Sequence, residues 1–320
     1  MATVLVSFAN PAFASAQRWL SHSARQFGIA QQHLFTAQQF AQTDFFARHQ
    51  HIAAEPFGAG LYLWKPYYIL QVLQQLQEGD VLLYADSGHV FVQDPQPLID
   101  LTAQQDIVLF ENYQGYHFFG ISGLPFTADN CYRNVNHIRY WCKADALLLQ
   151  DAYHDETVLN SMMVDASIML FRKSARSVAF VETWLQHCCD RRSISPDDNQ
   201  LGQPNHPGFI MHIYDQSIIS IMASQQRLPL YRCPSQYGNH YKPVAMRRPY
   251  EYQMLPGTEP LANSAYDTIT RHHRYKDKGS WWRWKTFLYK EFMMLNTHVL
   301  RHRIGWVNRW LKLPPYKLFS

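Results

Sequence analysis

Four short stretches of the chain place charged side chains next to residues that leave room for a ligand. The first is GDVLLYADSGHVF, in which an apolar run over 80–85 leads to the carboxylate of Asp86, followed by Ser87 and Gly88. A carboxylate that follows a buried strand emerges where open α/β sheets bind ligands, and small neighbours allow close approach. Asp86 is therefore a candidate ligand-binding acid, although an Asp after a strand often only caps a turn or helix.

The second stretch precedes a helix predicted to begin near Pro66. It reads GAGLYLWKP, from Gly58 to Pro66, and contains the indole of Trp64 and the ammonium group of Lys65. Backbone N–H groups at a helix N-terminus can hold phosphate together with a cation, and an indole offers a stacking face. The alternative is a tight turn with a buried tryptophan.

The third stretch, HIYDQS, opens a predicted helix with an apolar side. It begins at His212, and the adjacent Asp215 and Gln216 offer a carboxylate and an amide to a polyhydroxylated ligand. The structural alternative is that Asp215 caps the helix.

The fourth stretch, RHHRYK, begins at Arg271. The imidazoles of His272 and His273 can ligate a divalent metal, and the guanidinium of Arg274 can neutralise a diphosphate. A solvated basic segment is the alternative.

Strands and helices alternate along the chain and must position these groups. Predicted strands cover 3–8, 80–85, 106–110 and 165–171, predicted helices cover 14–27, 66–77 and 174–189, and a loop rich in Pro, Asn and Gly spans 190–209. Such alternation favours a mostly parallel sheet. We expect an α/β domain over residues 1–270, followed by a basic aromatic extension over 271–320.

The composition is typical of a folded intracellular protein. The chain has 320 residues, of which 47% are hydrophobic, enough for a substantial core. Its five cysteines form no CxxC pair, which excludes a zinc ribbon and a disulfide framework and indicates a reducing cytosol. AFASA near the N-terminus imitates a signal-peptidase site. A signal peptide is nevertheless not expected, because no Lys or Arg precedes the apolar N-terminal segment and Asn10-Pro11 interrupts it. No stretch approaches the roughly 20 apolar residues of a spanning helix.

Positive charge is concentrated at the C-terminal end. Residues 271–320 contain twelve Lys and Arg against two acidic residues, interleaved with Trp, Tyr and Phe. This composition fits helices lying among lipid headgroups, and equally a helical pair packed on the body of the protein. Nucleic-acid binding is disfavoured, because the body offers no basic face and no recognition motif.

Taken in order, several segments resemble a bacterial family of GT-A glycosyltransferases associated with capsule, lipopolysaccharide and O-antigen assembly. The series is GAGLYLWKP, GDVLLYADSG, KSARSVAFVETWL, NHPGFIMHIYDQS, YRCPSQYGN and HHR, and the resemblance covers residues 3–275. It implies a hexosyltransferase with a Rossmann-like GT-A fold, a mostly parallel central sheet flanked by helices. It also implies a nucleotide-sugar donor, with a UDP-sugar favoured, and a glycan or lipid-linked acceptor.

The resemblance also implies a donor site. Asp86 matches the first Asp of an Asp-x-Asp element that reaches the ribose and, through a divalent cation, the donor diphosphate, whereas Gly88 replaces the second. There are two alternatives. In the first, Mn²⁺ or Mg²⁺ binds Asp86, and His272 or His273 completes the coordination together with water and phosphate. In the second, the enzyme works without metal. The donor-binding residues expected in full are Trp64, Lys65, Asp86, Ser87, Gly88, Lys143 and Arg274, of which Lys65 and Arg274 would neutralise the leaving diphosphate.

On the acceptor side, Asp215 with Gln216 resembles an Asp-Gln element found near the sugar. Its carboxylate would deprotonate the acceptor hydroxyl or stabilise an oxocarbenium-like centre, and the sequence does not decide between inversion and retention. Asp165 and His212 are further candidates for acceptor or sugar contacts, and Asp165 is alternatively a strand cap.

Three functional classes follow. A glycosyltransferase is the leading one, located in the cytoplasm and peripherally on the inner face of the cytoplasmic membrane, where a basic tail gains about 1 kcal/mol per cation near anionic lipid. A metal-dependent phosphoester hydrolase is suggested by the 16 histidines, but HHR contains the only adjacent pair of histidines and HExxH does not occur. A non-catalytic, lectin-like sugar-nucleotide-binding or scaffold protein is the third, suggested by Gly88.

Overall fold

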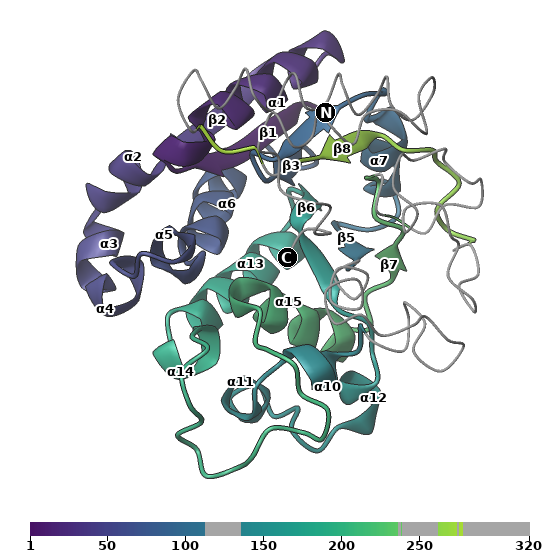
Figure 1. Ribbon diagram of the computed structural model, residues 1–320. Coiled ribbons are helices and arrows are strands. Elements are labelled where there is room, and N and C mark those ends of the chain that lie inside the picture. Colours follow the sequence, from purple (N-terminus) through teal and green to yellow (C-terminus); the bar gives the residue numbers. More distant parts are fainter. Residues whose placement is uncertain (113–135, 236–237, 239–261, 274, 278–320) are drawn as a thin grey trace, which may run out of the picture.

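A six-stranded sheet with helices on both faces forms the centre of the molecule (Figure 1). The computed structural model describes residues 1–112, 136–235, 238, 262–273 and 275–277. In spatial order the strands are β2 (Gln31–Thr36), β1 (Thr3–Ala9), β3 (Val81–Ala85), β6 (Val164–Arg172), β5 (Ile107–Glu111) and β7 (Leu230–Tyr231). A separate two-stranded ribbon pairs β4 (His89–Phe91) with β8 (Thr270–His272).

The sheet is mostly parallel, with one exception. β1 pairs in parallel with β2 and β3, and β5 pairs in parallel with β7. β6 lies between β3 and β5 and is antiparallel to both. The predicted α/β class with a mostly parallel sheet flanked by helices is confirmed, and β6 is the strand whose direction the prediction missed.

The two faces of the sheet are both apolar, because alternate residues of each strand point to opposite sides. Val4 and Val6 pack with α6 (Trp64–Gln75), α13 (Ala175–Cys188) and α15 (Tyr214–Gln225), a side called here the α6 face. Leu5 packs on the opposite face with α1 (Ala14–Gln26) and α7 (Gln96–Leu101).

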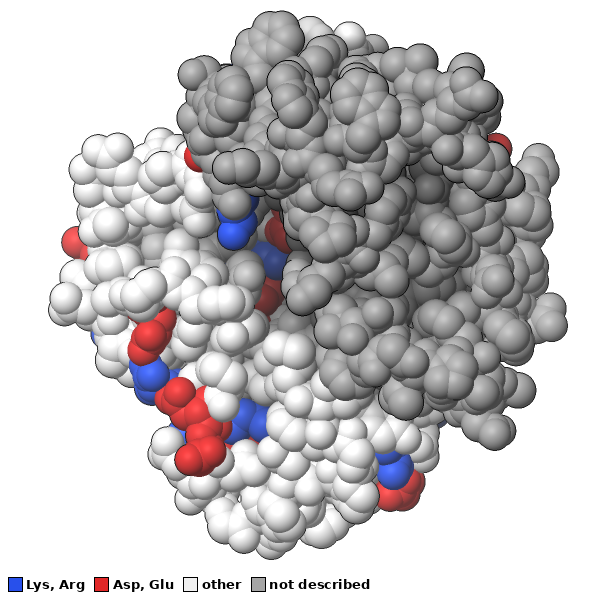
Figure 2. All heavy atoms as spheres, viewed as in Figure 1, with Lys and Arg blue, Asp and Glu red and all other residues white. Residues whose placement is uncertain are grey.

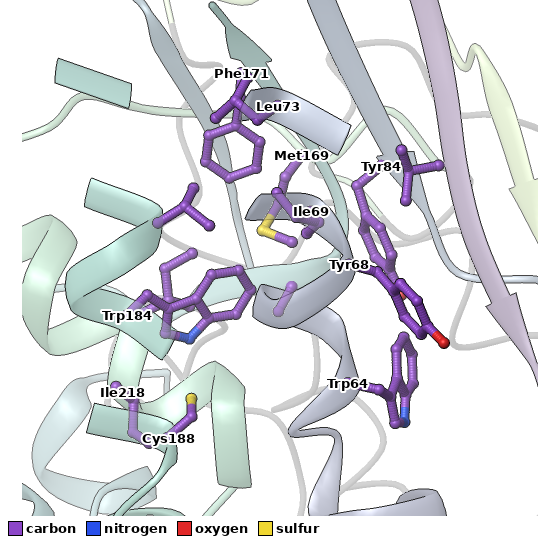
Figure 3. Close-up of a cluster of buried hydrophobic side chains, with 14 of the residues drawn as sticks. Trp64, Tyr68, Ile69, Leu73, Tyr84, Met169, Phe171, Trp184, Cys188 and Ile218 are labelled. Carbon is purple, nitrogen blue, oxygen red and sulfur yellow. The ribbon is translucent and has the colours of Figure 1, made fainter. Parts of the chain in front are cut away.

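Large aromatic side chains fill the α6 face. Figure 3 shows Trp64 and Tyr68 from α6, Tyr84 from β3 and Trp184 from α13 in one cluster, and each is at most 5% exposed. Buried aromatic rings of this size dominate core energetics, so α6, α13 and β3 are held firmly relative to one another.

Shorter helices complete the described part of the chain. They are α2 (Ala37–Ala41), α3 (Asp44–Arg48), α4 (Gln50–Ala53), α5 (Gly58–Leu61), α10 (Ile138–Trp141), α11 (Ala144–Leu148), α12 (Glu156–Leu159) and α14 (Arg191–Ile194), with a 3₁₀ turn η1 (Pro11–Phe13). α10, α11 and α12 pack with Ile221 of α15 in a cluster of their own. Among the helices in the described ranges, none combines the length and apolar character that crossing a bilayer requires.

The predicted elements agree with the structure to within a few residues. The predicted strands correspond to β1, β3, β5 and β6, and the predicted helices to α1, α6, α13 and α15. The elements that were not predicted are β2, β4, β7, β8, α2 to α5, α7 and α10 to α12, and α14 lies in the segment expected to be a loop. The expected boundary between residues 270 and 271 falls inside β8, while residues 278–320 of the expected extension lie outside the described residues.

A left-handed turn precedes α6. Ala59, Gly60, Leu61 and Tyr62 all have positive φ, between 53° and 98°. A Cβ at Gly60 would lie 2.7 Å from the carbonyl oxygen of Ala53, so this glycine is needed both for its φ of 98° and for the close approach of α4. The turn therefore determines where α6 begins.

Replacing Gly60 with alanine should destabilise the protein through both effects. The left-handed conformation alone costs roughly 1–2 kcal/mol for a residue with a Cβ. The collision with Ala53 should add about 1–3 kcal/mol. Gly202→Ala is the matched control, since Gly202 has a φ of 80° and nothing within 4 Å of an added Cβ. Urea unfolding of both variants measures the difference, and equal losses would mean that the contact with Ala53 is unimportant.

Candidate functional site

Asp86 emerges from the sheet on the α6 face. It follows directly after β3, and its side chain points to the same side as Tyr84 because it lies two positions further along the chain. The Tyr84 hydroxyl donates a hydrogen bond to Oδ1 of Asp86, and the Asp86 N–H donates to the carbonyl of Ser167 at 2.8 Å. With a side chain 32% exposed, Asp86 is anchored at one oxygen and accessible from solvent.

Lys65 lies at the start of α6 and is buried at 4% exposure. Its Nζ donates to the carbonyl of Ala166 at 3.0 Å and lies 3.2 Å from Oδ2 of Asp215 and 3.5 Å from Oδ1 of Asp86. An ammonium group has three N–H donors, and here three protein acceptors surround it. We call Lys65, Asp86 and Asp215 the ion cluster.

Asp215 reaches the cluster from α15. It is the second residue of that helix and is 3% exposed, and its carbonyl accepts a hydrogen bond from the Trp184 indole at 3.0 Å. Ile213 is the N-cap residue and has no side-chain cap, so the alternative that Asp215 caps the helix is wrong. Gln216 beside it is also buried, at 7% exposure.

The cluster perturbs the protonation of its members. Burial raises the pKa of Asp215 to about 6; the cation of Lys65 opposes this and the charge of Asp86 adds to it. For Lys65, burial lowers the pKa, but Asp215 and Asp86 outweigh it and the pKa rises above its ordinary value. At neutral pH Lys65 is therefore charged, and Asp215 is a carboxylate within reach of protonation.

The turn after Asp86 is closed by β8. The His89 N–H donates to the carbonyl of Asp86 at 3.0 Å, and the His273 N–H donates to the carbonyl of Gly88 at 2.7 Å. A Cβ at Gly88 would lie 2.5 Å from the carbonyl oxygen of His273. Position 88 therefore has a packing reason to be glycine, because a side chain there would push β8 away.

The histidines near this turn pack against one another, and metal binding by Asp86 with one of them, water and phosphate stays a prediction. The ring of His272 stacks on His89 with centroids 4.5 Å apart and planes 2° apart. His89 is buried between Ser167 and Thr270, and burial, with the charges of nearby groups, lowers its pKa to about 3. Across the described ranges no three His, Cys, Asp or Glu side chains come together as a ligand group, so Asp86, His272 and His273 do not form one. Arg274 lies outside the described residues.

Lys143 and His212 belong to a second polar network. Lys143 Nζ donates to the carbonyl of Asp197 at 2.7 Å and lies 3.9 Å from Oδ2 of Asp145, whose carboxylate also accepts from the N–H groups of Gln200 and Leu201. The Lys143 N–H donates to Nδ1 of His212 at 3.3 Å. These contacts hold the segment that follows α14, and none of them reaches the ion cluster.

Trp64 and Asp165 are both buried. Trp64 stacks on Phe8 with centroids 3.8 Å apart and donates from its indole N–H to the carbonyl of Gly58 at 2.8 Å, so its ring belongs to the core and the tight-turn alternative holds. Asp165 accepts from the Ser167 N–H at 2.9 Å and from the Cys233 thiol at 3.2 Å, and burial raises its pKa. Asp165 is thus a satisfied acid inside the sheet.

The sequence pattern did not identify the groups that organise the ion cluster. It assigns Tyr84 only to a strand, although its position two residues before Asp86 places both on one face. Ala166 contributes a backbone carbonyl and His89 acts through buried hydrogen bonds, and neither role has a sequence signature.

Comparison with known proteins finds only distant likeness. No protein-family model matches the chain, and no curated protein matches it. Similar solved structures include apo mouse xyloside xylosyltransferase 1, with a TM-score of 0.43, 9% identity and coverage of 86% of this chain and 98% of that one. They also include galactosyltransferase LgtC with donor and acceptor sugar analogues, with a TM-score of 0.38, 12% identity and coverage of 96% and 99%. Likeness at this level assigns neither fold nor function by itself.

Removing the ammonium of Lys65 should be strongly destabilising. Lys65→Met leaves two carboxylates without their cation, and breaking a buried ion pair from one side costs about 3–5 kcal/mol. The double variant Lys65→Met with Asp215→Asn should recover part of this loss, because one unpaired charge is removed. Lys173→Met, at a half-buried lysine outside the cluster, is the control and should cost at most about 1 kcal/mol. Denaturant unfolding measures all three, and a Lys65→Met variant as stable as the control would contradict the cluster.

Asp215 should titrate near pH 6 in the folded protein. Because its pKa is raised from 3.8 on folding, its contribution to stability is fully present below pH 3.8 and is lost as the pH rises through about 6. Carboxyl ¹³C NMR of Asp-labelled protein should show one resonance with this midpoint, absent in Asp215→Asn. In Lys65→Met the midpoint should move higher, since the opposing cation is gone; a midpoint near 4 in the wild type would refute the environment described.

Proposed function

We propose that this protein is a nucleotide-sugar-dependent glycosyltransferase of the GT-A type, and that the ion cluster is its reaction site. The observation that carries the proposal is the meeting of Asp86 and Asp215 at one buried cation, where β3 ends. Ligands of open α/β sheets bind outside the carboxyl ends of the strands, which is where this pair lies. The ordered series of motifs in the sequence supports the same function.

Asp86 and Asp215 have different roles in this proposal, because their environments differ. Asp86 is partly exposed and receives the donor, whereas Asp215 is buried with a pKa of about 6, a value suited to proton transfer near neutral pH. As the acceptor oxygen bonds to the anomeric carbon, its proton passes to Asp215 and the bond from that carbon to the phosphate oxygen breaks. If Asp215 instead lies on the opposite face of the sugar, its charge stabilises the oxocarbenium-like centre.

Lys65 organises the two acids. The sequence suggested that it neutralises the leaving diphosphate, but its Nζ donates to the carbonyl of Ala166 and forms ion pairs with both carboxylates. It keeps Asp215 oriented and lowers the pKa that burial alone would produce. Neutralisation of the diphosphate is assigned to Arg274; a divalent cation, when bound, would supply further positive charge there. Since the described donors do not fit a three-ligand metal site, no step here depends on a metal, and dependence on Mn²⁺ or Mg²⁺ stays a prediction.

The alternative functions gain little from the structure. A metal-dependent hydrolase would need a ligand cluster, and the described residues contain none. Gly88, which suggested a non-catalytic scaffold, has a packing role against His273. Binding without turnover is therefore kept as an outcome of the assay below.

The proposed setting is bacterial surface-polysaccharide or lipopolysaccharide assembly. The donor would be a UDP-sugar, and the acceptor a glycan or a lipid-linked saccharide. The excess of basic and aromatic residues over 271–320 supports attachment to anionic lipid on the inner face of the cytoplasmic membrane.

A panel of UDP-, GDP- and CMP-sugars tests the function. One donor should raise the melting temperature and release its nucleotide when an acceptor is present: UDP or GDP from the first two classes, CMP from the third. Repeating the assay with Mn²⁺ and with EDTA tests the cation. Asp215→Asn should keep donor binding and lose about 10²–10⁴-fold in turnover, as expected for a proton-transfer residue. Asp86→Asn should weaken donor binding.

Asp100→Asn is the control for both variants, because Asp100 is exposed on α7 and its carboxylate accepts a hydrogen bond from Gln96 of the same helix. It should leave binding and turnover unchanged. Failure of every nucleotide-sugar to stabilise the wild type would reject the proposal, and stabilisation without turnover would favour the scaffold.

Vesicle binding tests the membrane proposal. Full-length protein in which Arg301, Arg303, Lys312 and Lys317 are replaced by Gln should bind phosphatidylserine vesicles more weakly, on the order of 10²–10³-fold at low salt. Phosphatidylcholine vesicles are the control. Co-sedimentation measures binding, and equal binding by both proteins would exclude an electrostatic attachment.

A further inference from the structure

Three aromatic side chains from two segments meet beside the ion cluster. The ring of Phe57 stacks on Tyr214 with centroids 5.0 Å apart and planes 27° apart. Tyr62 lies 5.7 Å from Tyr214 and 6.1 Å from Phe57, and it meets Phe57 edge to face. We call these three residues the aromatic platform.

The platform connects solvent with the acid that the proposed reaction uses. Phe57 is 57% exposed, Tyr62 and Tyr214 are half-buried, and Tyr214 precedes Asp215 in the chain. Lys65 Nζ lies 5.3 Å from the centre of the Tyr62 ring. The accessible end of the platform is therefore apolar, and its inner end adjoins the charges of the ion cluster. In Figure 2, which has the same view as Figure 1, acidic and basic atoms lie together in a recess at the edge of the described surface.

Both tyrosines are presented by unusual backbone. Tyr62 has a φ of 66° and Tyr214 a φ of 43°, in the left-handed region that residues with a side chain rarely adopt. Such conformations persist only where the surrounding structure imposes them, and they concentrate at ligand-binding sites. Here the Tyr62 carbonyl accepts from the Lys65 N–H at 2.9 Å, so one turn places both the ring and the cation.

A pyranose ring matches this surface. One face of such a sugar exposes C–H groups that pack on aromatic rings, and its edge carries hydroxyls that need polar partners. The tyrosine hydroxyls provide such partners; burial, opposed by Lys65 and assisted by Asp86 and Asp215, raises the pKa of Tyr62 to about 12, so this hydroxyl keeps its proton. A lipid chain would leave these hydroxyls and the nearby carboxylate without partners.

We propose that Phe57, Tyr62 and Tyr214 form the acceptor subsite, in which a pyranose ring packs against Phe57 and Tyr214 with a hydroxyl directed at Asp215. The identity of this sugar as an acceptor rests on the proposed function, whereas sugar binding on the platform does not. The platform binds the sugar of the acceptor that carries the attacking hydroxyl, and it leaves donor recognition to Asp86.

Saturation-transfer NMR on the full-length protein tests the subsite. The probes are the methyl pyranosides of glucose, galactose, mannose, rhamnose and N-acetylglucosamine, with irradiation of protein aromatic protons. At least one probe should receive saturation on the C–H protons of one ring face. Phe57→Ala and Tyr214→Ala should each weaken its binding by roughly 3- to 10-fold, and Phe57→Trp should retain it because the stacking surface remains.

Trp19→Ala is the matched control, since Trp19 is an aromatic residue 47% exposed outside the platform. Its removal should leave the transferred signal unchanged, and thermal unfolding verifies that every variant is folded. The subsite is overturned if no pyranoside receives saturation, or if Phe57→Ala binds the pyranoside as well as the wild type does. It is also overturned if UDP occupies the platform and thereby displaces the sugar.

The two proposals fail in distinguishable ways. If nucleotide-sugars stabilise wild type and Phe57→Ala equally and no pyranoside binds, the subsite is wrong and the transferase function stands. If pyranosides bind the platform and no nucleotide-sugar stabilises the protein, the platform is a saccharide site and the transferase function is wrong. If the transferase function holds, Phe57→Ala should raise the acceptor KM and leave the donor KM unchanged.

Discussion

The burial of one ammonium group, that of Lys65, constrains the whole candidate site. Moving a cation out of water costs several kcal/mol, which only well-placed acceptors can offset. Those acceptors come from separate elements: the carbonyl of Ala166 in β6, Asp215 in α15 and Asp86 at the end of β3. Because all three must converge on one nitrogen, the relative positions of the sheet and two helices are coupled to the electrostatics of the site.

The left-handed turn before α6 positions residues of two chemically different surfaces, the ion cluster and the aromatic platform. On its inner side it delivers Lys65 to the carboxylates, and on its outer side it presents Tyr62 to Tyr214 and the exposed Phe57. The charged ion cluster next to the aromatic platform suits a ligand that has one apolar surface and one polar surface. A sugar ring that must both pack and lose a proton is such a ligand, which is why the turn is the natural place for acceptor recognition in the proposed reaction.

The candidate residues could be found separately in the sequence, but their grouping could not. The adjacent residues in the sequence mark Asp86, Lys65 and Asp215 as candidates. The sequence predicts that Lys65 binds phosphate, whereas in the structure Lys65 forms ion pairs with both acids. Trp64 has the composition of a ligand-stacking residue and lies in the core, because Phe8 of β1 packs on its ring. In the sequence, Gly88 suggested a lost carboxylate. In the structure, the backbone of His273 lies so close to Gly88 that no side chain fits there. Each difference arises from a contact distant in sequence.

Local patterns in the sequence determined the elements themselves. Continuous apolar runs such as β3 have to be buried on both faces, and the change from such a run to Asp86 marks the rim of the sheet. Tertiary structure alone decided that β6 runs against its neighbours, that Asp215 is paired rather than capping α15, and that the platform adjoins the cluster. The physical reason is that the direction of a strand and the partner of a charge depend on groups far away in the chain, brought together only by packing, whereas the periodicity that makes a strand or a helix is present in each segment itself.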